Sequence, residues 1–136
     1  MFERKFTKTV RPGNVLIGGG NPVSVQSMLN VPAHDIKGNV AQAVALEKAG
    51  CEIIRISVPD NESVKTLEAL KNAVKVPIVA DIHFDWRLAV LSAEAGADKI
   101  RINPGNIGAD EHVKAVADAC RAKNIPIRIG VNSGSV

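Results

Sequence analysis

The chain has 136 residues, of which 46% are hydrophobic and 23% charged, so it fits one globular domain and is not an intrinsically disordered protein. Its formal net charge of +3 suits an anionic small molecule at least as well as a nucleic acid, and with no Tyr, one Trp and three Phe nothing in the composition supports nucleic-acid binding. No stretch approaches the roughly 18 apolar residues of a membrane span, and the N-terminus lacks the apolar region of a secretory signal. We therefore expect no membrane association and take a cytoplasmic setting as the default.

The first twenty residues differ in pattern from the rest of the chain. Residues 7–17, with Pro12-Gly13-Asn14 at their centre, predict a β-hairpin that covers one end of a sheet. Gly18-Gly19-Gly20 is not a dinucleotide-binding fingerprint, because no strand of a βαβ unit precedes it. We expect residues 1–20 to form this hairpin and a glycine join, and residues 21–136 to form the main domain.

From residue 23 onward, strand-like and helix-like segments alternate. Strands are expected at residues 23–28, 52–58, 76–82, 99–103 and 125–131, and helices at 39–49, 85–96 and 110–124. A further helix is expected to begin at Asp60, its N-cap, with Val64, Leu67 and Leu70 as its inward stripe. Such alternation predicts parallel βαβ units, whose right-handed crossovers place all strand C-termini on one edge. An internal repeat, KAGCEIIRI (48–56) against EAGADKIRI (94–102), favours a barrel over a doubly wound sheet. The expected fold class is α/β: a partial TIM (β/α) barrel of about five parallel strands and four helices, preceded by the hairpin.

Polar residues occupy one face of every expected strand. Side chains alternate between the two faces of a strand, and here the aliphatic residues share one face while the polar ones share the other. The polar positions of the last four strands are Arg55, Ser57, Asp81, His83, Arg101, Asn103, Arg128, Gly130 and Asn132. An ordinary parallel sheet is apolar on both faces, so a polar inner face near the strand C-termini indicates the mouth of a barrel, where TIM barrels keep their sites.

Three of these inward residues are arginines: Arg55, Arg101 and Arg128. Arginine at an inward strand position is costly unless an anion meets it, so three that converge predict a phosphate or diphosphate pocket. One alternative stays open: Arg55 or Arg101 pairs with Asp81 in an internal salt-bridge network that binds nothing. Against this alternative, one inward acid facing three arginines leaves positive charge unmatched.

The two cysteines, Cys51 and Cys120, are far apart in the sequence and have no CxxC spacing. We interpret both as structural thiols, neither nucleophiles nor metal ligands.

Five motifs carry a resemblance to a known family, and together they cover nearly the whole chain. In chain order they are PVSVQSM, GCEIIRISVPD, VPIVADIHFDWRLA, KIRINPGNIG and IPIRIGVNSGS. The sequence resembles the N-terminal part of 4-hydroxy-3-methylbut-2-enyl diphosphate synthase, and the pair ADIHFD and RINPGNIG is the most specific part of the match. The resemblance implies a TIM-barrel domain of an oxidoreductase in non-mevalonate isoprenoid biosynthesis. It further implies reductive opening of 2-C-methyl-D-erythritol 2,4-cyclodiphosphate, with a [4Fe–4S] cluster and electrons from ferredoxin or flavodoxin.

The resemblance also assigns roles to residues of this chain by motif. Arg55, Arg101 and Arg128 are the expected diphosphate ligands. The residues expected to line the same pocket are Asp81, His83, Asn103 and Asn132.

The chain departs from the family pattern because it ends after five of the roughly eight strands of a TIM barrel. The rest of the barrel and the iron–sulfur domain are expected to be absent, so we expect this chain to bind no cluster, to contain no catalytic residue of its own and to be inactive alone. Exposed sheet edges predict a homo-oligomer. Two alternatives remain: another phosphate- or pterin-binding TIM-barrel enzyme, such as the dihydropteroate synthase type, and a non-catalytic oligomerising fragment.

Overall fold

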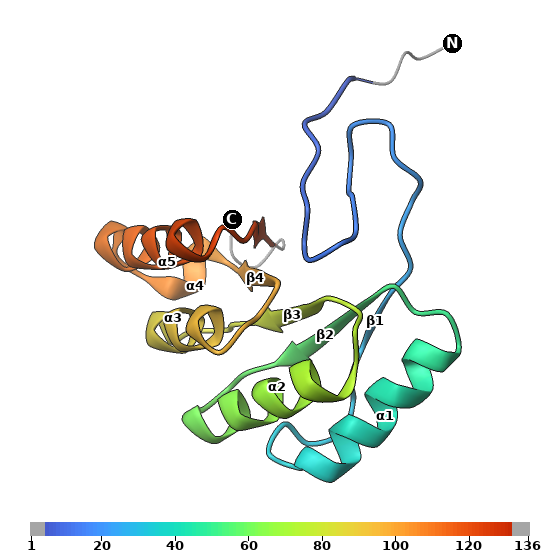
Figure 1. Ribbon diagram of the computed structural model, residues 1–136. Helices are drawn as coiled ribbons and strands as arrows, with labels where there is room; N and C mark the ends of the chain where they lie inside the picture. Colours follow the sequence, from blue (N-terminus) through green and yellow to red (C-terminus); the bar gives the residue numbers. More distant parts are fainter. Residues whose placement is uncertain (1–4, 132–136) are drawn as a thin grey trace.

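A computed structural model of the chain describes residues 5–131 and contains one parallel sheet flanked by helices (Figure 1). The five strands are β1 (Gln26–Met28), β2 (Ile53–Ser57), β3 (Ile78–Asp81), β4 (Lys99–Ile102) and β5 (Ile127–Ile129). The helices are α1 (Ile36–Lys48), α2 (Asn61–Ala73), α3 (Trp86–Glu94), α4 (Pro104–Ile107) and α5 (Asp110–Lys123). Each strand pairs in parallel with the next one along the chain. This consecutive order is that of a (β/α) barrel, so the predicted partial TIM-barrel fold is confirmed.

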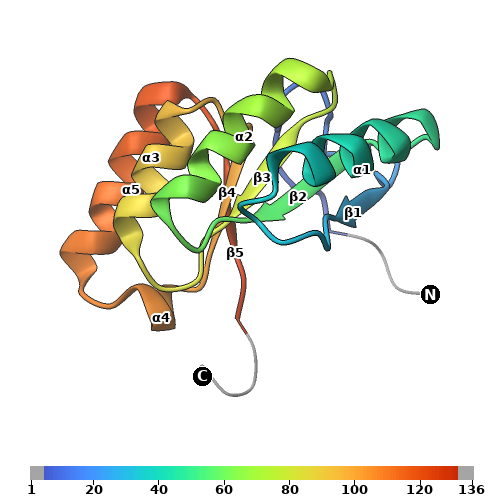
Figure 2. The same cartoon turned by 90° about the horizontal axis from the view of Figure 1, so that it is seen from below.

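The helices pack on the aliphatic face of the sheet (Figure 2). The sheet residues buried there include Ile54, Ile56, Val58, Ile78, Ala80, Ile82, Ile100 and Ile102, each at most 2% exposed. They have the parity expected from the sequence, and they meet helix residues such as Leu67, Leu70 and Val116. On the opposite, inner face of the described strands, Ile53 and Val79 are fully buried, while Met28, which pairs with Arg55, is 44% exposed.

Several elements differ from the sequence expectation. The first strand is shorter than residues 23–28: only Gln26–Met28 pairs with β2, and Val23 and Val25 are 91% and 58% exposed. Helix α1 begins three residues before its expected start, and β5 is shorter than the expected residues 125–131. Residues 104–107, for which the sequence predicted no helix, form the short helix α4. Pro104 stands at its start, where its missing N–H costs nothing, and the Asn103 side chain accepts a hydrogen bond from the Gly105 N–H.

The segment before β1 bends back on itself as a minimal hairpin. Val10 and Ile17 form a single antiparallel bridge, with two backbone hydrogen bonds of 2.8 Å. At the turn Gly13 has a φ of +56°, and a Cβ atom there would come within 2.9 Å of Pro77 Cγ. Pro77 directly precedes β3, so the turn packs at the N-terminal end of the strands. The domain boundary at residue 20 stays a prediction.

Within the part of the chain that the structure describes, no helix combines the length and the apolar character that a membrane crossing requires.

Candidate functional site

The strand register places four polar residues in one row across the inner face of the sheet. The Cα partners run from Ser57 to Asp81, from Asp81 to Arg101 and from Arg101 to Arg128. Asp81 and Arg101 lie at or near the C-terminal ends of their strands, so the row lies near the carboxyl edge of the sheet. The parity argument predicted all four residues for this face, and the structure brings them side by side.

Asp81 is the centre of this row. Its side chain is only 1% exposed, and its carboxylate accepts hydrogen bonds from two arginines. The Nε and Nη2 groups of Arg55 donate to Oδ2, with Nε at 3.1 Å, and Arg101 Nη1 donates to Oδ1 at 3.1 Å. The pairing envisaged for an internal salt-bridge network is therefore present. The Arg55 and Arg101 side chains are nevertheless 22% and 18% exposed, so both guanidinium groups still reach the solvent side of the sheet.

The positive charge on this face exceeds what Asp81 can neutralise. Arg128 is exposed, and among the described residues it forms no ion pair with an acid. Lys99, two residues before Arg101 on the same strand face, is only 7% exposed. Burial, and after it the nearby charges of Arg128 and Arg55, lower the pKa of Lys99 below its ordinary value. Four cations thus surround one carboxylate on this face, which gives it an excess of positive charge.

Gly130 provides the space for the Arg101 side chain. A Cβ atom at position 130 would lie 2.8 Å from Arg101 Cζ and closer still to Nε and Nη2. Any larger residue there would displace the guanidinium group. The sequence placed Gly130 on the inner face but gave no reason for a glycine at that position.

Two further predicted residues lie at the same edge. Ser57 Oγ and His83 Nε2 form a hydrogen bond of 2.7 Å. Asn103 is 1% exposed; its Oδ1 caps α4, while its buried Nδ2 has no hydrogen-bond partner among residues 5–131. A buried donor without a partner is costly, so Asn103 offers an amide that an anionic ligand can satisfy. The seventh predicted residue, Asn132, lies outside the described residues.

Lys99 is the residue that sequence reasoning missed. It begins β4 and has the same parity as Arg101 and Asn103, so the period-2 pattern contained the necessary information. Lys99 was not predicted as a site residue because it precedes the aliphatic residues that flank Arg101.

The two cysteines do not fit an iron–sulfur cluster. Such a cluster is usually held by four thiolates, and no group of three or more metal-binding side chains occurs among residues 5–131. Cys51 is buried and its thiol lies 3.1 Å from the Ile53 carbonyl oxygen. Burial raises the pKa of Cys120 to about 11, which keeps that thiol protonated at neutral pH. The described residues therefore offer no set of ligands for a cluster.

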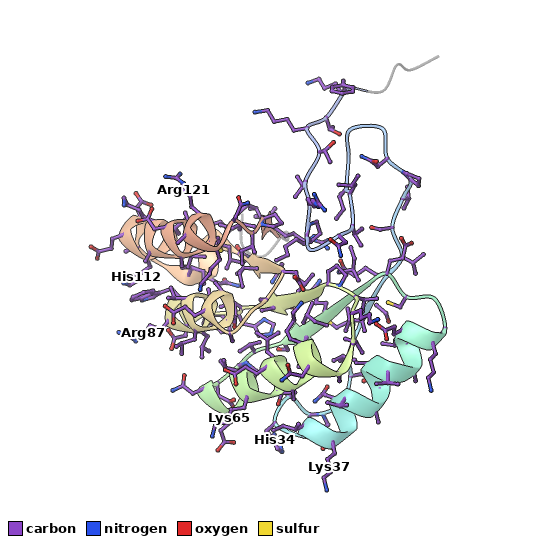
Figure 3. All side chains as sticks on the ribbon, in the orientation of Figure 1. His34, Lys37, Lys65, Arg87, His112 and Arg121 are labelled. Atoms are coloured by element: carbon purple, nitrogen blue, oxygen red, sulfur yellow. The ribbon has the colours of Figure 1, made fainter. Side chains whose placement is uncertain are left out.

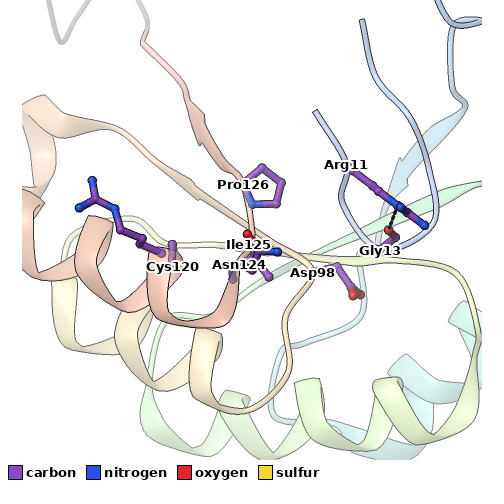
Figure 4. A pocket seen from close by; sticks show the side chains of 8 residues that line it. Arg11, Gly13, Asp98, Cys120, Asn124, Ile125 and Pro126 are labelled. Atoms are coloured by element: carbon purple, nitrogen blue, oxygen red, sulfur yellow. Dashed lines mark hydrogen bonds between the residues drawn. The ribbon is translucent and has the colours of Figure 1, made fainter. Parts of the chain in front are cut away.

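A separate cavity of about 560 Å³ lies at the opposite end of the strands (Figure 4). It is bordered by Arg11 and Gly13 of the hairpin, by Asp98 before β4, and by residues 120–126. Asp98 is already engaged there by Lys71 Nζ at 2.6 Å and by the Ile78 N–H at 2.8 Å. None of the site residues predicted from the sequence lines this cavity, so we assign it no role in the site.

A consecutive parallel β/α sheet with polar side chains near its carboxyl edge defines the class of TIM-barrel domains. Residues 7–136 match a family model described as the GcpE TIM-barrel domain, and the chain belongs to this family. The resemblance found in the sequence is thereby confirmed.

In several curated relatives, about half of the residues aligned with this chain are identical. A "4-hydroxy-3-methylbut-2-en-1-yl diphosphate synthase (flavodoxin)" of Caldanaerobacter subterraneus subsp. tengcongensis is 53% identical, over 98% of this chain and 38% of the relative. Proteins of the same name from Caldicellulosiruptor saccharolyticus and Listeria monocytogenes are 54% and 50% identical. The chain spans only 36–38% of the length of these relatives.

Solved structures support the fold alone. Dihydropteroate synthase from Xanthomonas albilineans superposes with a TM-score of 0.67 over 89% of this chain and 48% of that protein, at 19% identity. The N-acetylmannosamine-6-phosphate 2-epimerase of Clostridium perfringens superposes with a TM-score of 0.56 over 76% of this chain and 49% of that protein, at 18% identity.

Proposed function

We propose that this chain is the substrate-binding barrel portion of a 4-hydroxy-3-methylbut-2-enyl diphosphate synthase, and that its inner face binds the diphosphate of 2-C-methyl-D-erythritol 2,4-cyclodiphosphate. The observation that carries the proposal is the row of cations around one buried carboxylate. The names of the relatives, at 50–54% identity, support the choice of substrate. The whole enzyme is then an oxidoreductase of non-mevalonate isoprenoid biosynthesis. Its electron donor is flavodoxin, which those names contain, or ferredoxin, and its location is cytoplasmic.

Each residue of the row contributes to ligand binding in its own way. Arg101 and Arg128 donate hydrogen bonds to phosphate oxygens, because a guanidinium group matches the geometry of such an anion. Asp81 holds Arg55 and Arg101 in place before the ligand arrives. Asn103 Nδ2 donates to an oxygen of the ligand, while His83 with Ser57, and Asn132 beyond the described residues, line the pocket.

In the whole enzyme, a [4Fe–4S] cluster supplies the electrons for ring opening. Its ligands are not among the residues described here, so this chain contributes binding and orientation of the substrate. That the chain does not turn over the substrate on its own stays a prediction, which an assay for product with a chemical reductant checks.

Isothermal titration of two ligand classes tests the proposed function. The chain should bind 2-C-methyl-D-erythritol 2,4-cyclodiphosphate and show no heat with 7,8-dihydropteroate, because strands β1 to β5 carry cations on their inner face and no Phe, Tyr or Trp for stacking on a pterin. Binding of the pterin and not of the diphosphate would favour the dihydropteroate synthase type and refute the proposal.

Self-association of the chain is a separate proposal that rests on the two sheet edges. Val25 beside β1 and Ile129 in β5 are 58% and 57% exposed, and an unpaired edge is a template for pairing with another chain. Light scattering should give a mass above that of a monomer at high concentration. A monomeric mass throughout would remove the support for a homo-oligomer and for a purely oligomerising role.

A further inference from the structure

Lys99 is a buried lysine on the inner face of the sheet, one row below Arg101 and Arg128. Its Cα partner on β3 is Val79, whose own partner on β2 is Arg55. Lys99 therefore lies level with Arg55, one row nearer the strand N-termini than Asp81, Arg101 and Arg128. Its residue is 7% exposed, a degree of burial that is rare for lysine without a partner.

The charges around Lys99 are mostly of its own sign. The groups on neighbouring strands are Arg55 on β2, Asp81 on β3, Arg101 on β4 itself and Arg128 on β5. Arg55 and Arg128 lower the pKa of Lys99 by repulsion, in addition to the effect of burial. The one nearby carboxylate, Asp81, already accepts hydrogen bonds from two arginines. Within residues 5–131, no acid forms an ion pair with Lys99.

Such a lysine has two explanations with opposite consequences for stability. Its aliphatic stem could simply fill space on the inner face, in which case its charge is incidental to binding. Alternatively, its charge is retained at a cost to the fold because a bound anion needs it. A buried charge without a partner destabilises a fold, and replacing it by an apolar residue of similar volume is commonly neutral or stabilising.

We infer that Lys99 is a fourth cation of the diphosphate site, acting from the row below Arg101 and Arg128 on the phosphate oxygens that those arginines hold. The inference rests on the proposed function and deepens it. It explains why one face carries four cations around a single carboxylate: Asp81 neutralises only part of the positive charge, and the anionic ligand neutralises the rest. It also makes the site selective for a multiply charged anion such as a diphosphate.

Inorganic pyrophosphate titrated into the 136-residue chain and its variants tests the inference. Lys99→Met keeps the length of the side chain and removes its charge. We expect its pyrophosphate affinity to fall by about tenfold or more at low ionic strength, while its urea midpoint stays equal to that of the parent or rises. Lys99→Arg, which keeps the charge, should recover part of the affinity. Lys65→Met is the matched control, because Lys65 is exposed on α2 away from the inner face (Figure 3), and it should bind within about twofold of the parent.

The outcomes separate this inference from the proposed function. If Lys99→Met binds pyrophosphate with the affinity of the parent chain while Arg101→Ala binds it more weakly, the inference is wrong and the proposed diphosphate site is retained. A lower urea midpoint or a loss of folding in Lys99→Met would show that the lysine stabilises the fold, which also overturns the inference. If neither variant changes pyrophosphate binding, or the parent chain binds none, the proposed function fails as well.

Discussion

At the scale of single residues, Asp81 decides how the inner face is organised. One buried carboxylate receives two guanidinium groups that would otherwise repel each other. The ion pairs of the network hypothesis are present, and the anion site stays a prediction that involves the same residues. The network orients the arginines, and the surplus of positive charge remains for a ligand.

Asp81→Asn should lower the free energy of unfolding by about 2–3 kcal/mol, because it breaks a buried ion pair. The loss is small for a buried ion pair because both arginine side chains keep some contact with solvent. Pyrophosphate should restore part of the loss, since an anion can replace the missing carboxylate between the arginines. Urea unfolding with and without pyrophosphate measures both effects. Asp118→Asn, which removes an exposed acid paired only with Lys114 on α5, is the control and should change stability little. Equal stability of the parent and Asp81→Asn would contradict the account of the network.

Cys120 gives the fold a dependence on alkaline pH. Burial raises the pKa of its thiol from 9.0 to about 11, so between these values the folded state keeps a proton that the unfolded state loses. The free energy of unfolding should therefore fall as the pH rises from about 9 to about 11. Urea unfolding across this range should show a shallower fall in Cys120→Ala than in the parent chain. The same slope in both proteins would show that the thiol does not titrate as described.

The inward residues were largely predictable from the sequence, because a period of two is visible in any strand with alternating character. Asp81, Arg101 and Asn103 were found in this way. The partners of Asp81 were not predictable, because they depend on the register between strands. Nor was the need for Gly130, which reflects a contact with the side chain of Arg101 on the neighbouring strand.

At the scale of elements, the β4–β5 pair controls the position of Arg101. Gly130 follows β5, and its N–H donates to the Ile102 carbonyl oxygen at 2.9 Å, which fixes it beside the end of β4. The Arg101 guanidinium group occupies the space where a side chain at position 130 would begin. The pairing of two short strands thus sets the orientation of a ligand-binding group.

Gly130→Ala should weaken binding of the cyclic diphosphate several-fold and change the free energy of unfolding by less than about 0.5 kcal/mol, because a flexible guanidinium can move away from the new methyl group. Titration calorimetry and urea unfolding measure the two quantities. In the background of Arg101→Ala the same substitution should have no further effect on affinity, since it acts through Arg101. Additive losses in the double variant would argue against this dependence.

Among the elements, α2 and α5 matched their prediction closely, whereas β1 and β5 are shorter than predicted and α1 begins three residues early. Helices α2 and α5 follow apolar stripes visible in the sequence, with Asp60 capping α2 as expected. Strand β1 is shorter than predicted because it lies at an edge and pairs on one side only. Helix α4 depends on a single capping contact from Asn103, and four residues give too little periodicity to reveal it.

At the scale of the whole molecule, the order of the strands follows from alternation and right-handed crossovers alone. Each β/α unit adds its strand beside the previous one, so all carboxyl ends meet at one edge. The sequence could therefore predict that Asp81, Arg101 and Arg128 converge, although they lie 20 to 47 positions apart. That convergence and the membership of the GcpE TIM-barrel domain family support the same interpretation from independent observations.

The central claim is that the cationic row binds the cyclic diphosphate, and titration calorimetry of Arg101→Ala tests it most directly. Arg87→Ala, an exposed arginine on the outer side of α3 (Figure 3), serves as the control for a simple loss of positive charge. We predict that 2-C-methyl-D-erythritol 2,4-cyclodiphosphate binds the parent chain and Arg87→Ala alike, and that Arg101→Ala loses at least about tenfold in affinity. Equal affinity of Arg101→Ala and the parent chain would contradict the account.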